Sequence, residues 1–89
     1  MAERKAVVGS KVGLHARPAS LLVQAAARQP VAVTIRKDGG EAVDARSILS
    51  VIGLDARAGD TVVLSATGEG ADSVLEELAV LVESDMDAS

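Results

Sequence analysis

The sequence predicts an α+β fold, a two-layer sandwich in which one antiparallel or mixed sheet of four strands carries helices on one face. Two apolar patterns alternate along the chain. One has the period of two residues that is typical of half-buried strands, and the other has the period of about 3.6 that is typical of amphipathic helices. Their order is strand, helix, strand, strand, short helix, strand, helix. No linker or internal repeat interrupts the 89 residues, so we expect one domain over residues 1–89.

The chain opens with a predicted strand followed by a predicted helix. Residues Arg4–Gly9 form a short β-branched run closed by glycine, and a loop follows as far as Gly13. Apolar residues then recur at helical spacing, at Ala19, Leu22, Val23 and Ala26. Pro30 stops this pattern, so the first helix is expected to end before it.

The next two segments indicate a β-hairpin. Val31–Lys37 alternates larger apolar residues with small or polar ones, as a half-buried strand does. Residues 38–40 (DGG) tolerate a positive φ and suit a tight turn. We therefore expect the second strand of the hairpin over Glu41–Ala45.

Ser47–Leu54 (SILSVIGL) allows two interpretations. The apolar run is compatible with a buried strand, or with a short helix capped by Ser47 and ended near Gly53. We favour the short helix.

The last strand and helix are predicted from the end of the sequence. Asp60–Thr67 places apolar residues on one face, and residues 68–70 turn the chain away. A helix follows with apolar residues at Val74, Leu75, Leu78, Leu81 and Val82. Ser73 and Glu76 match a capping box, although Asp72 is an alternative start one residue earlier. Residues 84–89 have nothing to bury, so we expect a frayed tail.

Composition excludes several classes of function. The chain has no Phe, Tyr or Trp for stacking bases, and its net charge of −4 disfavours a nucleic-acid partner. No apolar segment approaches the roughly 20 residues that span a bilayer. The absence of cysteine fits a reducing compartment. We therefore expect a cytoplasmic monomer that needs no metal or bound cofactor.

The only histidine, His15, is the first candidate functional residue. A helix that begins near Pro18 has main-chain N–H groups without partners and a partial positive charge at that end. The residue before a proline avoids helical geometry, so Arg17 is expected just outside the helix. An anion on the imidazole would meet Arg17 and a cradle formed by Ala16, Pro18 and Ala19. This pattern predicts a phosphoryl group carried on His15.

Three other interpretations of the histidine are open. A single histidine in a loop is often an ordinary surface residue. A catalytic zinc site usually needs three protein ligands, and the chain offers one histidine and no cysteine. A Ser-His-Asp hydrolase is conceivable from the residue types, but no GxSxG pattern is present.

The stretch Gly13–Ala19 (GLHARPA) resembles the active-site signature of the HPr family, the histidine-containing phosphocarriers of the phosphoenolpyruvate-dependent sugar phosphotransferase system. The resemblance extends over nearly the whole chain. It implies an HPr-like open-faced β-sandwich of four antiparallel strands covered on one face by three helices. It also implies that His15 takes a phosphoryl group through Nδ1 from phosphorylated enzyme I and hands it to the IIA domain of a sugar permease, with Arg17 stabilising the transfer.

The resemblance also implies a docking surface and a regulatory site. Leu21, Ile48 and Leu49 match positions that meet enzyme I and IIA domains, whereas their spacing alone is equally compatible with core packing. Ser47 matches a serine that an ATP-dependent kinase phosphorylates in some bacteria, and otherwise reads as a plain helix cap. Two alternatives share the fold: a regulatory binding module switched at Ser47, and a carrier in a nitrogen-regulatory relay.

Overall fold

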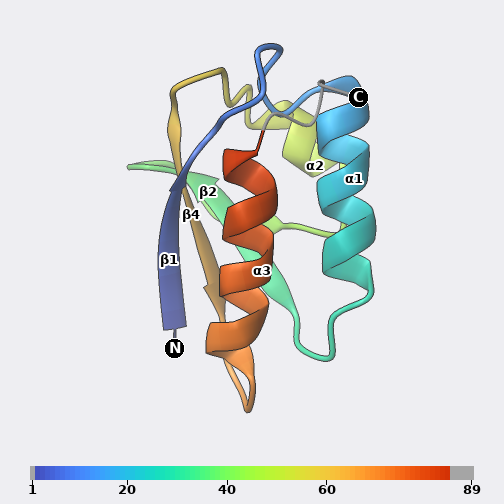
Figure 1. Ribbon diagram of the computed structural model, residues 1–89, viewed down its shortest axis with the longest axis vertical. Coiled ribbons are helices and arrows are strands. Elements are labelled where there is room, and N and C mark those ends of the chain that lie inside the picture. Colours follow the sequence, from blue (N-terminus) through green and yellow to red (C-terminus); the bar gives the residue numbers. More distant parts are fainter. Residues whose placement is uncertain (1, 85–89) are drawn as a thin grey trace.

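The computed structural model describes residues 2–84, which form a four-stranded antiparallel sheet and three helices (Figure 1). The elements are β1 (Ala2–Val7), α1 (Ala16–Ala27), β2 (Val33–Lys37), β3 (Val43–Asp44), α2 (Ile48–Gly53), β4 (Thr61–Ala66) and α3 (Ala71–Glu83). This order and the fold class confirm the sequence prediction. Of the tail expected to fray, Ser84 caps the end of α3, and residues 85–89 lie outside the described residues.

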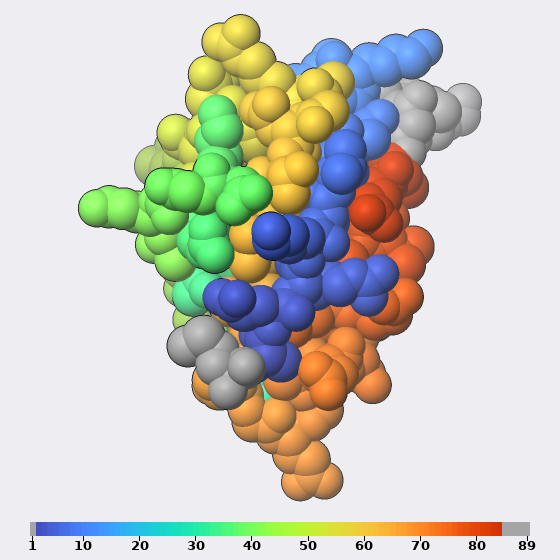
Figure 2. Space-filling view, turned by 90° about the vertical axis from the view of Figure 1, so that its left-hand side faces the viewer, coloured from blue at the N-terminus to red at the C-terminus, as the bar shows by residue number. Residues whose placement is uncertain are grey.

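The strands lie in the order β1-β4-β2-β3, and every neighbouring pair is antiparallel. The helices cover one face, where α1 and α3 run in opposite directions (Figure 1). From the side, β1 lies directly against α3 (Figure 2). The start of α1 and the end of α3 therefore come to the same end of the molecule, with α2 close by.

The alternation in β4 explains which face the helices cover. Val62, Leu64 and Ala66 are buried, as predicted, and point to the helices. Val63 points to the other face and is also buried, because Lys5 and Arg36 lie on either side of it in register. The long stems of such side chains cover apolar surface while their charges stay in water.

The core is built without an aromatic ring. Its largest fully buried residues are Leu14, Leu22, Ile35, Leu64, Leu75 and Leu78. Each leucine or isoleucine buried in this way contributes about 1.5–3 kcal/mol of transfer free energy. Ala26 on α1 and Ala79 on α3 are also buried, and the two helices are in contact.

The bounds of all four strands differ from the prediction. β2 begins at Val33 instead of Val31, and β4 covers Thr61–Ala66 instead of Asp60–Thr67. β1 covers Ala2–Val7 instead of Arg4–Gly9, because the N–H of Gly9 donates to the carbonyl of Val82 at 3.0 Å and leaves the sheet. A Cβ on Gly9 would overlap the carbonyl of Glu83, so only a glycine at this position lets the chain pass this close to α3. β3 has two residues, because Asp44 accepts the N–H of Arg46 at 2.9 Å and turns the chain.

The predicted start of each long helix was wrong. α1 begins at Ala16, so Arg17 lies inside its first turn; Ala16 adopts a left-handed φ of 49°, which turns the chain into the helix before Pro18. α3 begins at Ala71, and neither Asp72 nor Ser73 is its cap. Its N-cap is Gly70 with φ 83°, a conformation that glycine adopts without steric cost.

The short helix α2 is confirmed. Ser47 is its N-cap, and the Ser47 hydroxyl oxygen accepts the N–H of Ser50 at 3.3 Å. Val51 is the buried residue of this helix. Within residues 2–84 no helix combines the length and apolar character needed to cross a membrane.

Candidate functional site

His15 is the N-cap residue of α1 and has an extended backbone, with φ −125° and ψ 165°. Its side chain makes no capping hydrogen bond to the helix, and 37% of it is exposed. The preceding residue, Leu14, is fully buried. The imidazole is therefore held at the surface by a neighbour fixed in the core.

Gly13 brings the histidine loop against the loop that follows α2. Its φ of +75° is left-handed, and a Cβ there would overlap the carbonyl of Ala56 and lie 2.9 Å from the Cα of Arg57. The next N–H, of Leu14, donates to the carbonyl of Ala56 at 2.8 Å. This close contact places residues 55–57 beside His15, although they are about 40 positions away in the sequence.

Asp55 is the acidic residue next to the imidazole. Its Oδ1 lies 3.4 Å from Nε2 of His15, and its Oδ2 lies 3.2 Å from a guanidinium nitrogen of Arg57. The Arg57 guanidinium, and to a smaller extent His15, hold the pKa of Asp55 below its ordinary value, while desolvation opposes them. The carboxylate is therefore ionised over the physiological range.

The first turn of α1 leaves two main-chain donors for an anion. The N–H groups of Ala16 and Arg17 have no acceptor among residues 2–84. Of the other predicted cradle residues, Pro18 has no N–H, and the N–H of Ala19 donates to the carbonyl of His15 at 3.4 Å. The Arg17 side chain is exposed and makes no ion pair in the described part of the chain.

The three predicted docking residues differ in exposure. Leu49 is 80% exposed and Ile48 is 37% exposed, whereas Leu21 is half-buried against the core. α2, which begins with Ile48 and Leu49, contacts α1 and lies at the end of the molecule where α1 starts, directly after His15 (Figure 1). Val12, in the loop before His15, is also an exposed apolar residue there, and the sequence analysis did not select it.

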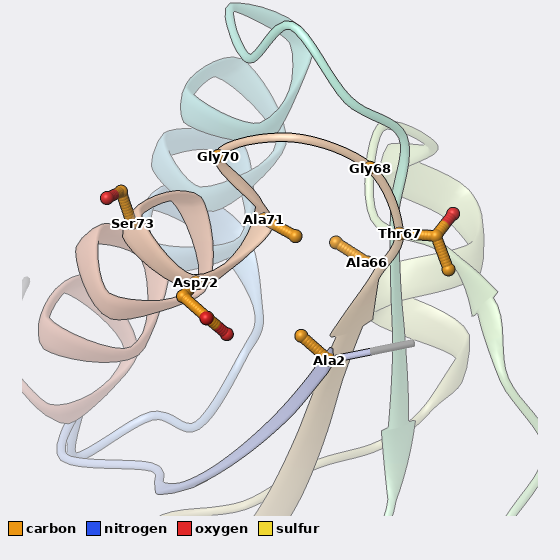
Figure 3. A pocket seen from close by; sticks show the side chains of 8 residues that line it. All are labelled: Ala2, Ala66, Thr67, Gly68, Gly70, Ala71, Asp72 and Ser73. Atoms are coloured by element: carbon orange, nitrogen blue, oxygen red, sulfur yellow. The ribbon is translucent and has the colours of Figure 1, made fainter.

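A cavity of about 650 Å³ lies at the opposite end of the molecule, between the start of α3 and the ends of β1 and β4 (Figure 3). Small residues line most of it, and the carboxylate of Asp72 faces it. None of the predicted site residues borders this cavity. Residues 2–84 contain no group of three or more His, Cys, Asp or Glu side chains placed to hold a metal ion.

Asp55 is the charged residue of this site that the sequence did not indicate. No motif links it to His15, because the two meet only through the backbone contact between Leu14 and Ala56. The available signal was an aspartate in the predicted turn after the short helix, which is a common position for that residue.

Comparisons with known proteins agree on one family. A family model described as "PTS HPr component phosphorylation site" matches residues 2–84. Phosphocarrier protein HPr of Streptomyces coelicolor is 52% identical over 82 residues, which cover 92% of this chain and 88% of that protein. HPr-like protein Crh of Bacillus subtilis is 41% identical over 86 residues, which cover 97% of this chain and 100% of that protein.

Solved structures give the same result. HPr-C-His from Thermoanaerobacter tengcongensis has a TM-score of 0.89 and 35% identity, covering 100% of this chain and 99% of that chain. An HPr dimer from the same organism has a TM-score of 0.69 and 36% identity, covering 93% of this chain and 94% of that chain.

A further sequence relative, named phosphocarrier protein NPr, from Shewanella violacea, is 33% identical over 96% of this chain and 92% of that protein. With a family model over residues 2–84, a shared fold and a half-exposed histidine at the start of α1, the chain belongs to the HPr family of phosphocarrier proteins.

Proposed function

We propose that the chain is the phosphocarrier of a phosphoenolpyruvate-dependent sugar phosphotransferase system. In this proposal His15 accepts a phosphoryl group from phosphorylated enzyme I and passes it to the IIA domain of a sugar permease. The observation that carries the proposal is the half-exposed imidazole at the N-terminus of α1, beside two main-chain N–H groups without partners. Membership of the HPr family supports the same role.

The transfer is a displacement at phosphorus. The lone pair of Nδ1 forms a P–N bond while the bond from phosphorus to the donor breaks, and the donor keeps that electron pair. The N–H groups of Ala16 and Arg17 and the Arg17 guanidinium are donors for the phosphoryl oxygens. In the second transfer the P–N bond breaks and its electron pair returns to Nδ1.

The carrier acts between partners and is not an independent enzyme. Leu49 and Ile48 offer exposed apolar contacts at the end of the molecule that holds His15, so we propose that enzyme I and the IIA domain use this surface in turn. One copy supplies every site residue, so a monomer suffices. We expect the exchange to take place in the cytoplasm.

The test is phosphorylation with phosphoenolpyruvate and enzyme I, followed by mapping of the labelled side chain. We expect one acid-labile, base-stable phosphate, lost in His15→Ala. Arg17→Ala should slow transfer on the order of 10- to 100-fold, since a hydrogen bond to a charged group contributes about 1.5–3 kcal/mol. Arg28→Ala, which removes an exposed arginine at the other end of α1, is the matched control and should transfer normally. An unlabelled wild-type protein would refute the proposal.

A regulatory binding module switched at Ser47 is the second candidate. Ser47 caps α2 directly before the exposed Ile48 and Leu49, so a phosphate there would add charge to an apolar surface. The relative named HPr-like protein Crh makes this candidate worth testing. Labelling of Ser47 alone, with ATP as the donor and a serine kinase as the partner, would favour it over the relay.

A further inference from the structure

The carboxylate of Asp55 contacts His15 with one oxygen and Arg57 with the other. Asp55 Oδ1 lies 3.4 Å from His15 Nε2, and Asp55 Oδ2 lies 3.2 Å from Arg57. The contact with the ring is longer than an ordinary hydrogen bond, but it lies within the range of electrostatic attraction. Because Arg57 binds the second oxygen, the carboxylate is held beside the imidazole ring.

The backbone at Asp55 is strained. Its φ of 53° is left-handed, and among residues 2–84 the other non-glycine residue with a positive φ is Ala16, at 49°. Both residues adjoin the same histidine: Ala16 follows His15 in sequence, and Asp55 Oδ1 lies 3.4 Å from its Nε2. Strained residues of this kind persist where the surrounding structure fixes them, and they concentrate at functional sites.

Hydrogen bonds on both sides fix this strained turn. The N–H of Asp55 donates to the carbonyl of Ile52 at 3.0 Å, at the end of α2. The carbonyl of the next residue, Ala56, accepts the N–H of Leu14 at 2.8 Å. The carboxylate is therefore carried on a segment tied both to α2 and to the histidine loop.

A carboxylate beside Nε2 selects one form of the imidazole. A neutral imidazole has one N–H, and an ionised carboxylate accepts hydrogen bonds but cannot donate one. The contact is therefore favourable when the hydrogen is on Nε2, and this tautomer leaves the lone pair on Nδ1.

We infer that Asp55 is a positioning residue that holds His15 in the Nε2–H tautomer, so that Nδ1 is the phosphoryl acceptor, and that Arg57 holds Asp55 in place. The inference about the tautomer does not depend on the proposed function; only its expected effect on phosphoryl transfer rests on that function. When the P–N bond forms at Nδ1, the hydrogen stays on Nε2 and the ring becomes cationic beside the carboxylate. When that bond breaks, the electron pair returns to Nδ1, so no proton has to move in either step.

The test measures the tautomer and the transfer rate separately. ¹⁵N NMR of the unphosphorylated protein at about pH 8.5, where an ordinary imidazole is neutral, reports which ring nitrogen carries the hydrogen. Asp55→Asn and Asp55→Gly should both lower the fraction of the Nε2–H tautomer. Transfer from enzyme I should slow about 1.4- to fivefold, the range set by the 0.2–1 kcal/mol of an exposed charge pair.

Asp38→Asn is the matched control, because it removes an exposed aspartate paired with Lys5 and changes the net charge equally. It should leave the tautomer and the rate unchanged. Neither Asp55 variant should lose folding, since asparagine and glycine tolerate a left-handed φ. Wild-type tautomer fractions in both Asp55 variants would overturn the inference. If the wild-type protein were not phosphorylated at all, the proposed function would fail, and the NMR measurement would still decide the role of Asp55.

Discussion

At the scale of single residues, Gly13 decides where His15 lies. It is the point at which the histidine loop touches the loop after α2, and its left-handed φ leaves no room for a side chain facing Ala56. Gly39 has a similar φ of +87°, but nothing lies within 4 Å of the position a Cβ would take. The two glycines therefore both have a left-handed φ, but only Gly13 has a neighbouring backbone segment against it.

This difference makes the effect of the contact measurable. Gly39→Ala should lower the free energy of unfolding by about 1 kcal/mol, the cost of a left-handed alanine. Gly13→Ala should lower it by about 3 kcal/mol, because the overlap with the neighbouring backbone adds to the same cost. It should also slow phosphorylation of His15. Urea titrations of both variants check the prediction, and equal losses would show that the close approach has no effect.

The same contact explains which residues of the site were predictable. His15 and Arg17 lie within one short stretch, so a pattern of neighbouring residue types was enough to select them. Asp55 reaches His15 only through a backbone hydrogen bond between distant loops, and no local pattern records such a bond. The free donors also differ from the prediction, because Ala16 turns left-handed and draws Arg17 into the first turn.

At the scale of secondary structure, α2 combines a structural cap with the proposed docking surface. Ser47 fixes the start of the helix through the N–H of Ser50, and the next two residues are apolar and exposed. A change at Ser47 can therefore affect folding and docking in opposite directions.

Two substitutions at Ser47 separate these effects. Ser47→Ala should lower the free energy of unfolding by about 1 kcal/mol through loss of the cap, with little change in transfer from enzyme I. Ser47→Asp keeps a capping oxygen and adds a negative charge at the helix N-terminus, so stability should be retained. Its transfer should nevertheless slow, because the charge lies beside Ile48 and Leu49. Thermal unfolding and transfer kinetics measure both; slowing by Ser47→Ala alone would contradict this account.

Leu49 and Val80 provide a comparison of exposed apolar residues. Leu49 on α2 is 80% exposed and Val80 on α3 is 56% exposed, so neither truncation to alanine should cost much stability. Leu49→Ala should raise the KM for phosphorylated enzyme I several-fold, because an apolar contact in the complex is lost. Val80→Ala should leave it unchanged. Equal effects of the two substitutions would place the docking surface elsewhere.

The elements themselves show where pattern reasoning succeeds. α1 and β4 were predicted because their apolar residues repeat with the period of the structure that buries them. The start of α3 was missed, because the side chains of Asp72 and Ser73 suggested caps while the backbone of Gly70 made the turn. β3 is shorter than predicted because Asp44 accepts a hydrogen bond from the N–H of Arg46 and the chain turns there. The spacing of apolar residues does not indicate such a hydrogen bond.

At the scale of the whole molecule, exposed aspartates make the free energy of unfolding depend on pH in the acid range. The pKa values of Asp44, Asp55 and Asp60 all lie below the ordinary value, chiefly because of hydrogen bonds from Arg46 to the first and from Arg57 to the other two. A lowered folded pKa means stabilisation that is complete above the unfolded pKa, about 3.9, and is lost as pH falls through the folded values.

We therefore expect the free energy of unfolding to be level from neutral pH down to about pH 5 and to fall below about pH 4. The change should be small and should shrink in salt, since these groups are exposed. Asp60→Asn should flatten the acid limb, whereas Asp72→Asn, at a carboxylate without an ion pair in the described residues, should not. Urea unfolding as a function of pH checks this, and a rise in stability towards pH 3 would reverse the sign.

β1 is made first and pairs last. Its partner in the sheet is β4, and the segment that follows it is tied to Ala56 and Val82 through Leu14 and Gly9. A ribosome adding about 5–20 residues per second releases His15 well before those partners emerge. During synthesis the histidine is an ordinary side chain on an unpaired segment, and the proposed acceptor site is complete only when the last strand and helix have left the ribosome. Under the proposed function, unfinished chains would therefore not compete with the folded carrier for enzyme I.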